Sequence, residues 1–166
     1  MNYHNITKCD MLNGEGVRVV LWVSGCLHGC KNCHNPQTWS PSSGIPFDDN
    51  ALQEIYAELE NPYVDGITFS GGDPLHPRNF NTILWLCTQI KQKYPTKNIW
   101  VYTGYTFDHV KLLYSDILEY IDVLVDGKYV EELNTPSPKW CGSTNQRIID
   151  VKKSLETGGV VLYETM

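Results

Sequence analysis

The stretch Cys26-Leu-His-Gly-Cys30-Lys-Asn-Cys33 places three thiols within eight residues of the chain. It follows Val17–Ser24, a run rich in β-branched and aromatic residues that predicts a buried strand. A closed structural metal site needs four ligands, and disulfides need cysteines in pairs. Three thiolates on one loop can instead hold three irons of a cubane cluster and leave the fourth iron open. We therefore expect the rest of the chain to build a pocket around that open iron.

A zinc site is the alternative interpretation of the same loop. His28 or His34 could complete a four-ligand set with the three thiols. Structural zinc sites, however, usually take their ligands from two separated knuckles. The chain has no second knuckle, because Cys9, Cys87 and Cys141 are scattered singly. We interpret these three cysteines as packed thiols.

Composition restricts the class of protein. A length of 166 residues suits a single domain, and no apolar run approaches the ~20 residues of a membrane-spanning helix. The first ten residues lack a signal-peptide pattern, so we expect a cytoplasmic protein with reduced thiols. A net charge of −6 argues against a nucleic-acid binder. Partners are then proteins or small molecules.

Predicted strands alternate with predicted helices along most of the chain. The clearest strands are Val17–Ser24, Val64–Ser70, Asn98–Thr103 and Ile121–Val125. Helical spacing of apolar residues predicts three helices. The first begins at Asp48 or Asp49, the second begins at Phe80, and the third runs through Val110, Leu113, Ile117 and Tyr120. Arg147–Val151 and Val160–Tyr163 are weaker strand candidates. The alternation predicts an α/β fold with a mainly parallel sheet and outer helices. A complete eight-stranded barrel takes about 250 residues, so an open or partial barrel is expected.

Each clear strand ends in a chemically distinctive segment. The segments are the cysteine loop, Gly71-Gly72-Asp73-Pro74, Thr103-Gly104-Tyr105 and Asp126-Gly127-Lys128. Because parallel strands bring their carboxyl ends to one edge, we expect all four to share one site.

Two of these segments can each be interpreted either as a turn or as part of a ligand-binding site. Gly71-Gly72 is either a tight turn or a close approach of backbone to a ligand, with Asp73 or nearby carbonyls accepting from an ammonium group. Asp126-Gly127 is typical of a hairpin turn, but Lys128 could pair with a ligand carboxylate.

These motifs together resemble one family. The matching segments are Asn13–Arg18, Val23–Cys26, Ser70–His76, Ile99–Tyr105, Val123–Lys128 and Gly142–Gln146. In this order they are similar to the activating proteins of anaerobic (class III) ribonucleotide reductase, within the radical S-adenosylmethionine (SAM) superfamily. The resemblance covers nearly the whole chain. It implies one radical SAM domain over residues 1–166, folded as an incomplete (β/α) barrel.

The resemblance also implies an enzyme, an oxidoreductase that generates a radical on another protein. Cys26, Cys30 and Cys33 hold a [4Fe–4S] cluster whose open iron binds the amino and carboxylate groups of SAM. One electron from reduced flavodoxin or a similar donor then cleaves SAM to methionine and a 5′-deoxyadenosyl radical. That radical takes a hydrogen atom from a glycine near the C-terminus of anaerobic ribonucleoside-triphosphate reductase. From the net charge and the lack of a long apolar run, we expect neither a nucleic-acid nor a membrane partner.

Contacts to SAM are assigned by the same resemblance. Gly71, Gly72 and Asp73 face its ammonium group, and Lys128 faces its carboxylate. The adenine lies near Cys33 and its neighbours. The superfamily often has an aromatic residue just before the third cysteine, where this chain has Asn32. His34, or the backbone of residues 32–34, is then the candidate adenine contact.

Two related activities remain as alternatives. One is activation of another glycyl-radical enzyme, such as pyruvate formate-lyase, and the other is radical SAM chemistry on a small molecule. Activating enzymes of other glycyl-radical enzymes are usually longer, with more complete barrels. The small-molecule enzymes resemble this chain at Gly14-Glu15-Gly16 but not at Gly142-Ser-Thr-Asn-Gln146. Its small, polar composition, continued to Arg147, makes this loop a candidate for docking the reductase or lining the site.

Overall fold

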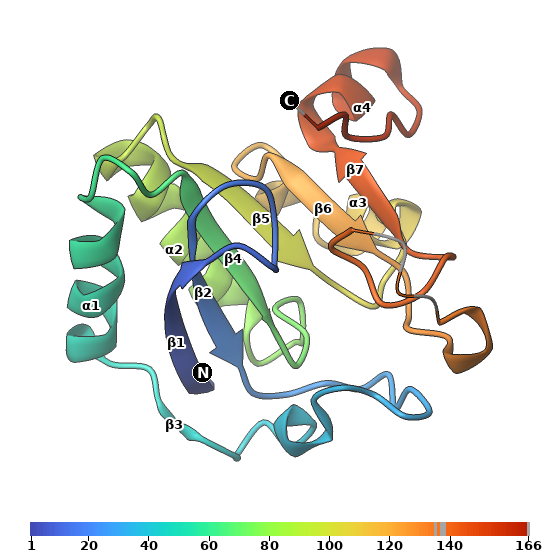
Figure 1. The fold of residues 1–166 in the computed structure, drawn as a ribbon, viewed down its shortest axis with the longest axis horizontal. Helices are drawn as coiled ribbons and strands as arrows, with labels where there is room; N and C mark the ends of the chain where they lie inside the picture. Colours follow the sequence, from blue (N-terminus) through green and yellow to red (C-terminus); the bar gives the residue numbers. More distant parts are fainter. Residues whose placement is uncertain (135, 137–138, 166) are drawn as a thin grey trace.

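One mixed sheet organises residues 1–134, 136 and 139–165, which are the residues that the computed structural model describes. Its strand order is β3-β1-β2-β4-β5-β6-β7 (Figure 1). The strands are β1 (Asn2–Asp10), β2 (Arg18–Val23), β3 (Ile45–Pro46), β4 (Gly66–Gly71), β5 (Asn98–Tyr102), β6 (Val123–Asp126) and β7 (Arg147–Asp150). The helices are α1 (Asp49–Leu59), α2 (Phe80–Lys93), α3 (Phe107–Leu113) and α4 (Val151–Thr157). Short 3₁₀ turns cover Pro36–Thr38, Ser115–Ile117 and Glu131–Leu133.

The centre of the sheet is parallel and its two sides are antiparallel. β2 pairs with β4, β4 with β5 and β5 with β6, all in parallel, and these are the four strands predicted from the sequence. β1 pairs with β2 and β7 pairs with β6, both antiparallel. The prediction of an α/β fold with a mainly parallel sheet is confirmed. β1 was not predicted, because Ile6 is its single buried residue and the strand carries no clear alternation.

Three helices cover one face of the sheet. Successive side chains of a strand point to opposite faces. Leu21, Phe69 and Val101 point to the face where Ile55 of α1 and Ile83 of α2 complete the main core. Figure 1 shows α2 and α3 behind the sheet, and loops follow the carboxyl ends of the parallel strands. This arrangement leaves the opposite face to be covered by loops rather than helices.

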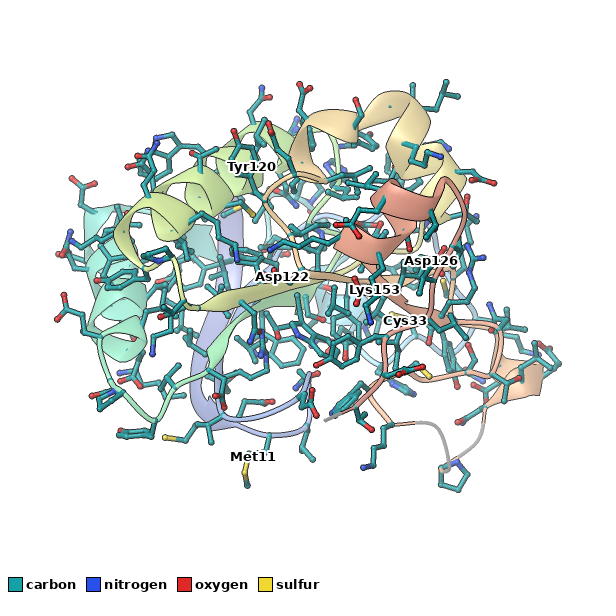
Figure 2. All side chains as sticks on the ribbon, turned by 90° about the horizontal axis from the view of Figure 1, so that it is seen from above. Met11, Cys33, Tyr120, Asp122, Asp126 and Lys153 are labelled. Carbon is teal, nitrogen blue, oxygen red and sulfur yellow. The ribbon has the colours of Figure 1, made fainter. Side chains whose placement is uncertain are left out.

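The opposite face carries a buried cation. Arg18 is fully enclosed and donates to the hydroxyl of Thr68 (2.8 Å) and to the carbonyls of Glu15 (2.9 Å) and Ile67 (2.8 Å). Its guanidinium lies 5.3 Å from the centre of the Trp100 ring. Burial lowers the pKa of Arg18 to about 10. This cluster fixes the loop that joins β1 to β2, where Met11 projects outward (Figure 2).

Capping residues set the helix starts. Asp48 accepts from the Ala51 amide at the start of α1, as expected, and Asp150 caps α4 in the same way. The third helix is shorter than predicted. It was expected to extend to Tyr120, but α3 ends at Leu113 and a 3₁₀ turn follows.

The C-terminal elements depart further from the prediction. The strand expected at Arg147–Val151 exists as β7, followed by the unpredicted α4. The strand expected at Val160–Tyr163 is reduced to one isolated bridge between Ile149 and Leu162. None of the helices in the described ranges has the length and apolar composition needed to cross a bilayer.

Candidate functional site

The cysteine loop begins where β2 ends. The Gly25 amide donates to the Thr38 carbonyl (2.6 Å), and the Cys26 amide donates to the Trp39 carbonyl (3.0 Å). These bonds tie the start of the loop to the segment that follows it. All six cysteines are unpaired thiols. Without a metal, burial raises the pKa of Cys26 to about 11.

The three thiols do not converge on one point. No group of three His, Cys, Asp or Glu side chains in the described part of the chain is arranged to hold a single metal ion. A mononuclear zinc site is therefore not preformed. A cubane cluster makes a different demand, because each thiolate binds a separate iron. Free thiols spaced along one loop fit that donor set.

A cavity of about 420 Å³ lies at the carboxyl ends of β2, β4, β5 and β6. It brings together most of the predicted site residues, namely Cys26, Cys30, Cys33, His34, Gly71, Gly72, Asp73 and Lys128. Asn32 does not line it; this residue is exposed and has a left-handed backbone (φ 55°). Figure 2 shows Cys33 on the same side of the molecule as Asp126, the last residue of β6. Strand topology therefore collects in one place segments that are far apart in the sequence.

Asp73 is buried and already surrounded by donors. Its Oδ2 accepts from the hydroxyl of Thr103 (2.9 Å), the amide of Gly104 (3.0 Å) and the Nε2 of His28 (2.6 Å). Its Oδ1 accepts from the Leu75 amide (2.8 Å). The side chain is 2% exposed. The carboxylate thus joins the ends of β4 and β5 to the cysteine loop, which leaves it little capacity for a ligand ammonium group.

His28 is the functional candidate that sequence reasoning missed. It was considered only as a zinc ligand, whereas its ring is buried between Asp73 and Gly104. A Cβ placed on Gly104 would lie 2.5 Å from the His28 ring, so glycine is required there. The ring also meets Tyr105 edge-on at 4.6 Å between centres. The signal available in the sequence was its position inside the cysteine motif.

Gly72 permits a second close approach at the same place. A Cβ on this residue would lie 2.6 Å from the Gly25 carbonyl oxygen, which precedes the first cysteine. The Gly72 amide donates to the Val23 carbonyl (2.8 Å), and the Asp73 amide donates to the Gly25 carbonyl (2.7 Å). The Gly-Gly-Asp turn therefore packs backbone against backbone with the cysteine loop.

Lys128 extends the cavity wall after β6. The hairpin suggested by Asp126-Gly127 does not form, because β6 pairs with β5 and β7 instead. Gly127 has a left-handed backbone (φ 97°) that turns the chain toward the cavity. Within the described residues, Lys128 has no ion-pair partner. It is a free cation beside the cysteines.

The Gly142–Gln146 loop is hydrogen-bonded to the main chain of the segment that carries Lys128. The Gln146 side chain accepts from the Gly142 amide (2.7 Å) and donates to the Gly127 carbonyl (3.0 Å). The Asn145 side chain donates to the Lys128 carbonyl (2.8 Å). Ser143 is fully buried and accepts from the Val130 amide (3.1 Å). The polar groups of this loop are thus used internally.

The remaining cysteines differ from one another. Cys87 is buried in the main core, as predicted, and burial raises its pKa. Cys9 is exposed, so its interpretation as a packed thiol is wrong. Cys141 is half-buried and lines the cavity near Tyr102, which sequence reasoning also missed. The Tyr102 hydroxyl is buried without a hydrogen-bond partner in the described structure, and burial raises its pKa.

Comparisons with known proteins identify the family of the chain. A family model described as a 4Fe-4S single cluster domain matches residues 12–149. The chain is 46% identical to the anaerobic ribonucleoside-triphosphate reductase-activating protein of enterobacteria phage T4, over 89% of this chain and 93% of that protein. The protein of the same description from Haemophilus influenzae is 47% identical over 89% and 97%. That from Escherichia coli K12 is 45% identical over 88% and 96%. The chain therefore belongs to the family of anaerobic ribonucleoside-triphosphate reductase-activating proteins.

Proposed function

We propose that this protein activates anaerobic ribonucleoside-triphosphate reductase by radical SAM chemistry. The observation that carries the proposal is the single cavity in which three free thiols, a glycine-rich turn and an unpaired lysine meet. The names of the relatives support the choice of the reductase as the protein substrate. We assign residues 1–166 to one radical SAM domain, and its open sheet with helices on one face to an incomplete barrel.

The chain's own residues would bind and orient two groups. Cys26, Cys30 and Cys33 are the proposed ligands of a [4Fe–4S] cluster. When bound, the reduced cluster supplies the electron that cleaves SAM, and the carbon-centred radical released takes a hydrogen atom from a glycine of the reductase. Lys128, a free cation in the cavity, would pair with the SAM carboxylate. The protein's part is to place these groups and to exclude water.

The ammonium and adenine contacts are refined by the geometry. Because four donors occupy the Asp73 carboxylate, we assign the ammonium to main-chain carbonyls of Gly71 and Gly72 and give Asp73 a positioning role. For the adenine we favour His34 over Asn32. The His34 ring faces the cavity and lies 4.9 Å from the Tyr129 ring, whereas the Asn32 side chain is outside it. Cys33 would contribute its backbone.

The cellular setting follows from the chemistry. Six unpaired cysteines suit the reducing cytoplasm. The electron would come from reduced flavodoxin or a similar donor. We expect no nucleic-acid partner, given the net charge of −6.

Anaerobic reconstitution tests the proposal. The protein with iron and sulfide should bind about four irons, and after reduction it should release 5′-deoxyadenosine from SAM. Cys26→Ala should lose both properties, whereas the exposed Cys9→Ser should keep both. Addition of the reductase should then produce a glycyl doublet in electron paramagnetic resonance. A zinc-loaded protein without SAM cleavage would overturn the proposed chemistry, and SAM cleavage without the doublet would overturn the choice of substrate.

A further inference from the structure

The cavity that holds the cysteines has a floor on the sheet itself. A row of three side chains from adjacent strands lines it: Trp22 of β2, Ser70 of β4 and Tyr102 of β5. Trp22 and Ser70 pair in register. The residue before each member of the row packs in the main core, on the face that the helices cover. Because successive side chains of a strand alternate, the row points to the opposite face, into the cavity.

The surroundings of this floor are neutral. Cys141 lies near the Tyr102 hydroxyl, and burial raises the pKa of its thiol, which therefore keeps its proton. The Trp140 ring, which also lines the cavity, meets the ring of Trp100 at 5.2 Å between centres. Lys128, by contrast, lies beyond the end of β6. The charged groups of SAM therefore suit the part of the cavity beside Lys128, and the floor suits a neutral, polar group.

The Tyr102 hydroxyl is a hydrogen-bond donor that lacks an acceptor. Its oxygen is buried and has no hydrogen-bond partner among the described residues. Burial raises the pKa of Tyr102, so the hydroxyl stays protonated. A buried hydroxyl without a partner lowers stability, and phenylalanine would fill almost the same space without that cost. The hydroxyl is thus placed for an acceptor that enters the cavity from outside the chain.

We propose that Tyr102 orients the protein substrate: its hydroxyl donates a hydrogen bond to a main-chain carbonyl of the reductase segment that carries the target glycine. The inference rests on the proposed function and adds a substrate-binding residue to it. A glycine has no side chain, so it can be held only by its amide and carbonyl groups. A carbonyl is neutral, as the floor requires, and fixing it also fixes the direction of the neighbouring Cα–H bond. The hydroxyl is enclosed in the free protein, so the side chains around it, Cys141 among them, move apart as the segment enters.

Tyr102→Phe tests the contact, because it removes the hydroxyl and keeps the ring. In the reconstituted protein, the KM for the reductase should rise by about five- to tenfold, the effect of one lost hydrogen bond. The yield of glycyl radical for each 5′-deoxyadenosine released should fall, since a misplaced glycine is a poorer hydrogen donor. The KM for SAM should change by less than about twofold. Tyr63→Phe, at a 59% exposed position, is the matched control and should change none of these quantities.

Stability gives a second readout, which needs neither cluster nor SAM. Removing a hydroxyl that has no partner should raise the urea midpoint of metal-free Tyr102→Phe above that of the wild type, whereas removing a structural hydrogen bond would lower it. A lower midpoint or an unchanged KM for the reductase would overturn the proposal. A higher KM for SAM alone would also overturn it, by assigning the hydroxyl to SAM. Failure of the proposed function is distinguished by the wild-type protein, which would then give no SAM cleavage or no glycyl doublet.

Discussion

Two buried charges, Arg18 and Asp73, lie near opposite ends of the parallel strands. Both are held by hydrogen bonds, but they stabilise different parts of the molecule. Arg18, at the start of β2, is a cation held by carbonyl groups and an aromatic ring. Asp73, just after β4, is an anion held by four donors. The partners of Arg18 belong to the sheet and to the β1–β2 loop, whereas Asp73 holds His28 inside the cysteine motif. The first cluster secures the scaffold, and the second secures the loop that carries the proposed chemistry.

The largest effect on stability is expected at the scaffold cluster. Arg18→Met removes the buried charge and leaves the Thr68 hydroxyl and two carbonyls without their donor. The free energy of unfolding should fall by about 3 kcal/mol, since each abandoned buried group has its own desolvation cost. Urea denaturation of the metal-free protein measures it. Arg78→Met, at an exposed position, should stay within about 0.5 kcal/mol of the wild type. A similar loss in both variants would contradict a special role for Arg18.

Asp73→Asn should separate loop positioning from stability. The amide keeps the shape of the carboxylate but presents a donor where His28, Thr103 and Gly104 already donate. We expect the free energy of unfolding to fall by about 1–2 kcal/mol, less than for Arg18→Met. SAM cleavage by the reconstituted protein should nevertheless drop by about 10- to 100-fold, the range found when residues around a metal's ligands are changed, because His28 lies between the first two proposed ligands in the chain. Full SAM cleavage in this variant would show that Asp73, like Arg18, stabilises the scaffold and does not position the cysteine loop for catalysis.

The smallest effect concerns pH and the neighbouring His76. This ring is buried beside the cysteine loop, and burial lowers its pKa below the ordinary value of 6.5. The unfolded chain then binds a proton more readily than the folded chain. Stability from this group is complete above the unfolded pKa and decreases as pH falls through 6.5 toward the folded pKa. Urea denaturation between about pH 7.5 and pH 5.5 should show a weaker pH dependence in His76→Gln than in the wild type. Equal slopes would show that His76 does not titrate differently on folding.

Sequence patterns located the parallel strands because burial on both faces forces runs of apolar and β-branched residues. They located the cysteine loop because the spacing of three thiols within eight residues is read directly from the sequence and does not depend on the fold. They missed β1, whose pairing depends on backbone hydrogen bonds to β2 rather than on its own side chains. They also suggested a hairpin at Gly127, because a local turn signal carries no information about which distant strand competes for the pairing.

The sequence by itself located the four parallel strands, the three clustered thiols and the resemblance to the family, since local burial and motif spacing are written in residue types. Only the tertiary structure decided how those donors are held. The Asp73 carboxylate turned out to be occupied by His28, Thr103 and Gly104, because three loops from different strands meet at one buried anion. Likewise, the polar Gly142–Gln146 loop faces inward to fix the backbone around Lys128. Such assignments depend on distances between residues remote in sequence, and chain topology alone brings those residues together.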